Sequence, residues 1–204
     1  MRTRAAWCAA FVALVATACR EPAVPHPVAS QFRYLCCNLH YEKQEITDIN
    51  YLRGKVIPFG SRVQILSVGR DRVEFEAPGR PPITLVLQYG AGKMSMDEYL
   101  GRIFLVDDPY ARLPRLPRDA EKAREIDRVR RLIEEGTISV GMTRSEVLMA
   151  IGYPPAHGTP SLDAATWRYW VGPSDTFDVH FEGDVVTRMD RQEPPSSGRR
   201  RRRG

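Results

Sequence analysis

The sequence predicts an α+β protein in which a small β-barrel precedes a two-layer unit of two helices and three antiparallel strands. Short alternating segments, separated by glycine and proline turns, fill residues 31–105. Two amphipathic helical patterns follow, and three further strand patterns complete a unit over residues 120–190. Both termini are expected to be disordered.

The first 18 residues have the pattern of a secretory signal peptide. Arg2 and Arg4 precede an uncharged apolar run over residues 5–18, which is too short to span a bilayer comfortably. Two interpretations of the ATAC sequence at 16–19 remain open. Cleavage after Ala-x-Ala would release a soluble periplasmic protein, but the small residues before Cys19 also resemble a bacterial lipobox, with alanine where leucine is usual.

Lipidation of Cys19 would hold the chain at a membrane. Residues 19–30 contain three prolines and predict an extended tether of about 3.1 Å per residue. Arg20 stands where enterobacterial lipoproteins retained at the inner membrane have aspartate. We therefore expect a lipid anchor on the periplasmic face of the outer membrane, with a soluble periplasmic protein as the alternative.

The charge distribution argues against a nucleic-acid partner. The formal net charge is +5, but seven positive charges belong to Arg2, Arg4 and residues 199–203, so the remainder is nearly neutral. The arginine-rich segment 191–204 is predicted to be disordered. It is either a solvated end or a segment attracted to anionic lipid head groups, at about 1 kcal/mol per arginine near the surface.

Cys36 and Cys37 are the two cysteines outside the leader and the lipidation site. Adjacent cysteines rarely bond to each other because the ring is strained. The expectation is therefore two thiols on opposite faces of a strand, with at least one buried. His40 is close by, but a metal site needs three or four ligands, so the sequence predicts neither a metal nor another cofactor.

Residues 31–105 are predicted to form a β domain with one short helix, over Met94 to Leu105. The stretch 57–76 resembles an SH3-like barrel, which implies either peptide binding or a packing role. Residues 106–119 contain prolines and predict a linker between the halves. The strand patterns cover residues 34–41, 46–52, 61–69, 72–77 and 83–89.

Two helices open the second unit. The first is predicted over residues 119–135 and closes at Gly136. The second begins at Thr143, where Glu146 completes a capping box, and it ends at Gly152. Three strand patterns follow, at residues 165–171, 176–181 and 184–190.

This order of motifs resembles the SmpA/OmlA (BamE-like) family of outer-membrane assembly lipoproteins, over about a third of the chain. The resemblance implies a helix-on-sheet fold and a role in outer-membrane assembly. Family members carry little beyond this domain, whereas this chain has a β domain in front of it. The residues that carry the resemblance are Gly141, Met142, Thr143, Val147, Gly152, Pro154, Trp167, Tyr169 and Phe181.

The alternation of the last strands assigns two faces to their sheet. One row, which includes Trp167, Tyr169 and Val179, is predicted to pack beneath the helices. On the other face, Trp170 lies in a row with Arg168 and Arg188. A tryptophan between arginines is typical of a binding anchor, but the β domain could equally well cover it. The predicted partner surface consists of Arg168, Trp170, Asp178, His180 and Arg188.

No catalytic motif is found: the chain contains no GxSxG, HExxH or phosphate-binding loop. The sequence therefore predicts a protein that is not an enzyme. We expect a lipid-anchored scaffold or assembly protein that binds another envelope protein, possible partners including the outer-membrane assembly machinery. The alternative is a periplasmic protein-binding or inhibitor module.

Overall fold

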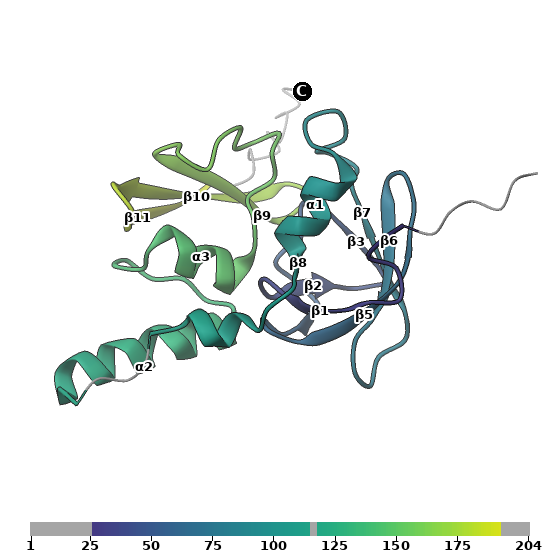
Figure 1. Ribbon diagram of the computed structural model, residues 1–204. Helices are drawn as coiled ribbons and strands as arrows, with labels where there is room; N and C mark the ends of the chain where they lie inside the picture. Colours follow the sequence, from purple (N-terminus) through teal and green to yellow (C-terminus); the bar gives the residue numbers. More distant parts are fainter. Residues whose placement is uncertain (1–25, 115–117, 193–204) are drawn as a thin grey trace, which may run out of the picture.

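A computed structural model describes residues 26–114 and 118–192, which form the α+β architecture that the sequence predicts (Figure 1). A curled sheet occupies the first half of the chain, and a smaller antiparallel sheet occupies the second half. Figure 1 shows the curled sheet on the right and the smaller sheet on the left, with helix α3 between the smaller sheet and α2.

The first half is a half-barrel built mainly from antiparallel pairs. Six strands follow the order β3-β7-β6-β5-β1-β8, and β2 pairs separately with β4. Only β3 and β7 run parallel to each other. Alternate side chains of the long strands point into a core that includes Val63, Ile65, Val73 and Phe75. The strands are β1 (Phe32–Leu35), β2 (Leu39–Tyr41), β3 (Glu45–Thr47), β4 (Lys55–Ile57), β5 (Arg62–Val68), β6 (Arg72–Glu76), β7 (Ile83–Val86) and β8 (Phe104–Leu105).

Two of the predicted strands are shorter in the structure. The pattern at 34–41 is divided into β1 and β2, and the pattern at 46–52 retains only β3. The second difference arises from a turn at residues 48–49, in which the Asn50 N–H donates to the Thr47 carbonyl at 2.9 Å. Asn50 itself has a left-handed backbone, with φ of 50°. Its side-chain oxygen accepts a hydrogen bond from the His40 N–H at 2.8 Å.

The expectation of two separate thiols on a strand is wrong. Cys36 and Cys37 form a disulfide with each other in the bend between β1 and β2. Both residues are buried, and Cys37 lies against Gly152 at the end of α3. The reason is local: the chain turns at this pair instead of continuing as a strand, so the two side chains do not alternate between faces.

The segment between the halves is mostly exposed over residues 106–114, and it is held to the rest of the molecule at Pro109 and Leu113, which are buried. Helix α1 (Met96–Ile103) matches the predicted short helix, and the 3-10 helix η1 (Pro109–Arg112) follows β8. Leu113 is buried in the core of the second half. The Tyr110 ring packs edge-on against Phe59 of the first half, with 5.0 Å between ring centroids.

Both predicted helices of the second half are present and begin at capping residues. Helix α2 (Ala120–Glu135) has Asp119 as its N-cap and ends at Gly136, which is left-handed with φ of 67°. Helix α3 (Arg144–Ile151) has the predicted capping box: Thr143 accepts from the Glu146 N–H, and the Glu146 carboxylate accepts from the Thr143 N–H. Figure 1 shows α2 projecting from the body, with its first turns far from both sheets.

Replacement of Thr143 by alanine is expected to lower the free energy of unfolding by about 1 kcal/mol, because the first turn of α3 loses its side-chain acceptor. Chemical denaturation would measure the change. Ser145→Ala is the matched control, since Ser145 is an exposed hydroxyl residue in the first turn of the same helix. Equal stabilities of the two variants would contradict a capping role for Thr143.

Helix α3 covers one face of the second sheet, whose strand order is β11-β10-β9, and α2 packs on α3. The predicted core row is confirmed at Trp167, Tyr169, Val179 and Phe181, which are buried against α3. Strand β11 continues through Gln192, so two residues assigned to the tail belong to the sheet. The strands are β9 (Thr166–Gly172), β10 (Asp175–Glu182) and β11 (Val185–Gln192).

Two buried asparagines join the halves. The Asn38 amide nitrogen donates to the carbonyls of Ile133 (2.6 Å) and Ala150 (2.8 Å), near the carboxyl ends of α2 and α3. The Asn50 amide nitrogen donates to the Ile151 carbonyl at 3.2 Å. Helix C-termini expose carbonyls without intrahelical partners. Here the half-barrel supplies donors to three of these carbonyls, and the Ile133 carbonyl also accepts from the Gly136 N–H at 3.1 Å.

His40 gives the half-barrel a dependence on pH. Burial lowers the pKa of its imidazole below the ordinary value of 6.5. The unfolded chain therefore binds more protons in this range, so this group makes the free energy of unfolding decrease as the pH falls below about 6.5. Urea denaturation between about pH 5 and 7 should show a smaller slope for His40→Gln than for the wild type; identical slopes would contradict this assignment.

The signal peptide, Cys19 and most of the tether lie outside the described residues, as does the chain from residue 193 onwards. None of the described helices combines the length and apolar character that crossing a bilayer requires.

Candidate functional site

The five predicted partner-surface residues lie on one face of the second sheet, opposite the helices. Cross-strand pairing places Arg168 beside Asp178, and His180 beside Arg188. Trp170 occupies the next position of the same row on β9 and pairs with Thr176. We call this surface the outer face. Its polar residues form two side-chain networks.

The first network is a two-point contact between Arg168 and Asp178. The guanidinium Nε and Nη2 donate to the two carboxylate oxygens, each at 2.7 Å. Asp178 is buried, whereas about half of the Arg168 side chain is exposed. The hydrogen bonding that the guanidinium donates to Asp178 raises the pKa of Arg168 above its usual value. This geometry fixes the plane of the guanidinium and leaves part of it open to solvent.

The second network is centred on His180. Its Nδ1 lies 3.0 Å from Thr166 Oγ1, and its Nε2 lies 3.0 Å from Asp190 Oδ2. Arg188 donates to the same Asp190 oxygen at 2.8 Å. Nucleophilic hydrolases use the same order of hydroxyl, imidazole and carboxylate. Here the groups are cross-strand neighbours on a sheet face, and Asp190 is shared between the imidazole and the Arg188 guanidinium.

Trp170 is half-buried by other parts of the chain. Its ring lies 4.6 Å from the His157 ring, whose other neighbour is Tyr89 of the half-barrel, at 5.5 Å. Gly158 approaches the indole so closely that a β-carbon there would lie 2.3 Å from it. The backbone carbonyl of Trp170 also accepts a hydrogen bond from the Leu52 N–H at 3.1 Å. Trp170 therefore contributes to the junction between the halves, and Arg188 is the more accessible outer-face residue.

Metal binding has little support in the described part of the chain. No group of three or more histidine, cysteine, aspartate or glutamate side chains there is arranged to hold a metal ion. The cysteines beside His40 are bonded to each other. The predicted lipidation site, Cys19, lies outside the described residues.

Sequence reasoning missed several residues of this region. Asp190 could have been found, because it lies two positions after Arg188 and therefore on the same face. No sequence pattern indicates the roles of four other residues, namely Asn38, Asn50, His157 and Tyr89. Their partners are distant in sequence, and neither periodicity nor capping patterns reveal such contacts.

The chain was compared with known protein families, curated proteins and solved structures, and none of them matches it.

Proposed function

We propose that the chain is a lipid-anchored cell-envelope protein with a non-catalytic scaffold or assembly role. The observation that carries the proposal is the order of elements in the second half: α2, a capping-box helix α3, and an antiparallel sheet β9-β10-β11 covered on one face. The same order is found in the SmpA/OmlA (BamE-like) lipoproteins. We propose further that the half-barrel is SH3-like and that Cys19 bears the anchor at the periplasmic face of the outer membrane.

The outer face is the proposed contact with an envelope protein. Its charged groups are held by neighbouring strands before any partner arrives, so little side-chain ordering would be required on binding. Arg188 is the best-exposed member, with 65% of its side chain accessible. An exposed arginine in a fixed polar network is suited to contact a carboxylate on a partner.

Lipidation can be tested with radiolabelled palmitate in a Gram-negative host. The wild type and Cys8→Ser should incorporate the label and fractionate with the outer membrane, whereas Cys19→Ser should not be labelled. Cys8→Ser is the matched control, because it removes a cysteine of the leader. An unlabelled wild type released by osmotic shock would contradict the anchor and support the soluble binding or inhibitor module.

The partner surface can be tested by photo-crosslinking in cells. A crosslinking residue at position 188 should capture a component of the outer-membrane assembly machinery, and one at position 122, on the projecting part of α2, should not. Capture of a periplasmic enzyme at position 188 would support the inhibitor alternative. Equal capture from both positions would contradict a specific outer face.

A further inference from the structure

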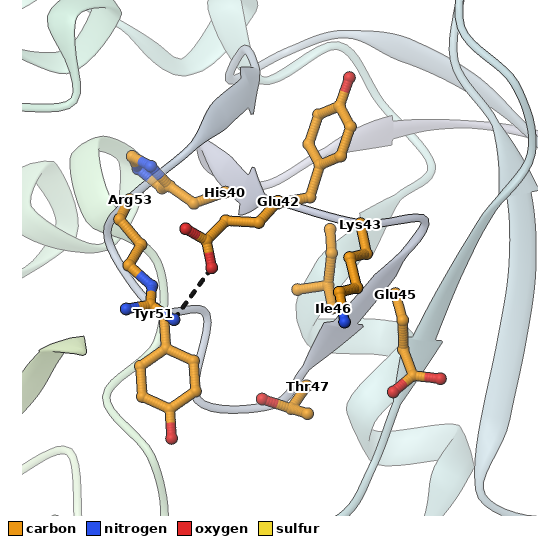
Figure 2. Close-up of a pocket in the computed structure, with 9 residues that line it drawn as sticks. His40, Glu42, Lys43, Glu45, Ile46, Thr47, Tyr51 and Arg53 are labelled. Atoms are coloured by element: carbon orange, nitrogen blue, oxygen red, sulfur yellow. Dashed lines mark ion pairs between the residues drawn. The ribbon is translucent and has the colours of Figure 1, made fainter. Parts of the chain in front are cut away.

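Two surface features lie outside the outer face. The first is a cavity of about 180 Å³ beside β2 and β3. Figure 2 shows its ion pair between Arg53 and Glu42, at 2.9 Å, and both side chains are about half exposed. The charges of its lining are balanced, so the cavity favours no particular ligand. The second feature is the edge of the second sheet that β11 forms.

The backbone of β11 directs hydrogen-bonding groups away from its own sheet. In antiparallel strands, successive residues point their N–H and C=O groups alternately to one side of the strand and to the other. Phe181 of β10 bonds towards β9, because its N–H donates to the Ala165 carbonyl at 2.8 Å. Val179, two positions earlier, therefore also bonds towards β9. Its partner on β11, Met189, directs its N–H and C=O to the edge, and so does Arg191, two positions further along.

Other parts of the edges of this sheet are covered. On β9, the Trp170 carbonyl accepts from the Leu52 N–H at 3.1 Å. At the start of β11, the Val186 N–H donates to the Met142 carbonyl at 2.8 Å. Among the described residues, no loop or strand gives comparable hydrogen bonds to residues 187–191, which we call the open edge. Unpaired strand edges are templates for pairing with another strand.

The side chains of the open edge are complementary to those of a second copy. Arg188 and Asp190 flank Met189, and in one copy they contact each other at 2.8 Å. If two copies of β11 pair antiparallel about a two-fold axis through Met189, each Arg188 lies opposite Asp190 of the other copy. Opposite charges at facing positions stabilise strand pairing, whereas like charges destabilise it. An axis through either charged residue would instead place two like charges opposite each other.

We propose that the open edge pairs with the open edge of a second copy of this chain, so that the protein forms a symmetric dimer about Met189. The Met189 N–H of each copy donates to the Met189 carbonyl of the other, and the two exposed methionine side chains pack together. The two three-stranded sheets become one sheet of six strands. This dimer does not depend on a lipid anchor, and it joins the outer faces of the two copies into one surface.

Sedimentation equilibrium of the purified full chain tests the association. Because the paired segment is short, the dimer should have a Kd on the order of 100 µM. Arg188→Asp and Asp190→Arg should each weaken dimerisation at least about tenfold, since each places like charges at both facing positions. An equal mixture of these two variants should form a heterodimer, in which every facing pair is again of opposite charge. A wild type that stays monomeric up to about 500 µM, or a mixture that does not associate, would overturn the proposal.

A further pair of variants locates the axis, and it replaces the charge reversals if thermal melts show that either of them does not fold. Met189→Lys brings two ammonium groups together at the axis and should weaken dimerisation at least about tenfold. Val185→Lys is the matched control: Val185 is 40% exposed and Met189 is 38% exposed on the same strand, but Val185 lies outside the open edge. Its Kd should remain within about twofold of the wild type. Equal effects of the two substitutions would overturn pairing through the open edge.

Discussion

Replacement of Asn38 by leucine is expected to lower the free energy of unfolding by about 2–4 kcal/mol. The side chain is fully buried. It donates to the Ala150 carbonyl and accepts from the Phe59 N–H at 2.8 Å. Leucine has a similar size but would leave both backbone groups unpaired, at about 1–3 kcal/mol each. Guanidinium denaturation followed by tryptophan fluorescence would measure the change.

Gln44→Ala is the control for this substitution, since it removes an amide side chain at an exposed position of the same half. Its stability should remain within about 0.5 kcal/mol of the wild type. If Asn38→Leu were equally mild, the amide would not hold the ends of α2 and α3 as described. Asn38→Asp should be at least as harmful as leucine, because a carboxylate would face two helix carbonyls.

Replacement of Trp167 by alanine is expected to lower the free energy of unfolding by about 3–5 kcal/mol. The side chain is 1% exposed. Its ring packs against Phe181, with 4.6 Å between centroids, and its Nε1 donates to the Leu162 carbonyl at 3.1 Å. The substitution would open a large cavity beneath α3 and remove that hydrogen bond. Circular dichroism during chemical denaturation would follow the loss.

Trp170→Ala is the matched control, because Trp170 lies on the same strand but is only half-buried on the opposite face. It should cost clearly less stability than Trp167→Ala, since less apolar surface leaves water at that position. A larger loss for Trp170→Ala would mean that the junction with His157 contributes more than the core beneath the helices.

The second half of the fold was predictable because its signals are local. Helix α2 has apolar residues at helical spacing and ends at a glycine, and α3 carries its capping box within four residues. The strands that follow alternate regularly, so the co-facial placement of Arg168, Asp178 and Arg188 follows from parity. Such signals need no knowledge of distant contacts.

The half-barrel was predicted less accurately because its interruptions depend on backbone conformation and distant partners. Asn50 has an ordinary place in an apolar pattern, yet its left-handed backbone follows a turn that has already ended the strand. Cys36 and Cys37 continue the apolar run, yet they form a bend and bond to each other. Alternation of residue types does not distinguish these positions from a continuous strand.

The outer face illustrates the same limit. The alternation of side chains along the strands predicts which residues belong to the outer face. It does not predict that His157 and Tyr89 partly bury Trp170, because these two residues come from separate loops. The junction through Asn38 joins residues 95 and 112 positions apart. Pattern reading of one sequence cannot identify partners at such separations.

Asn38 and Asn50 donate hydrogen bonds to α2 and α3, so the second half of the chain depends in part on the half-barrel. Removing the half-barrel would remove the hydrogen bonds that Asn38 and Asn50 donate at the ends of the two helices. It would also take Phe59 out of the core cluster that contains Ile133. The second half, expressed without the half-barrel, is therefore expected to be less stable than it is in the intact chain. A shorter protein with the same two helices would need other hydrogen-bond donors for the carbonyls at their carboxyl ends.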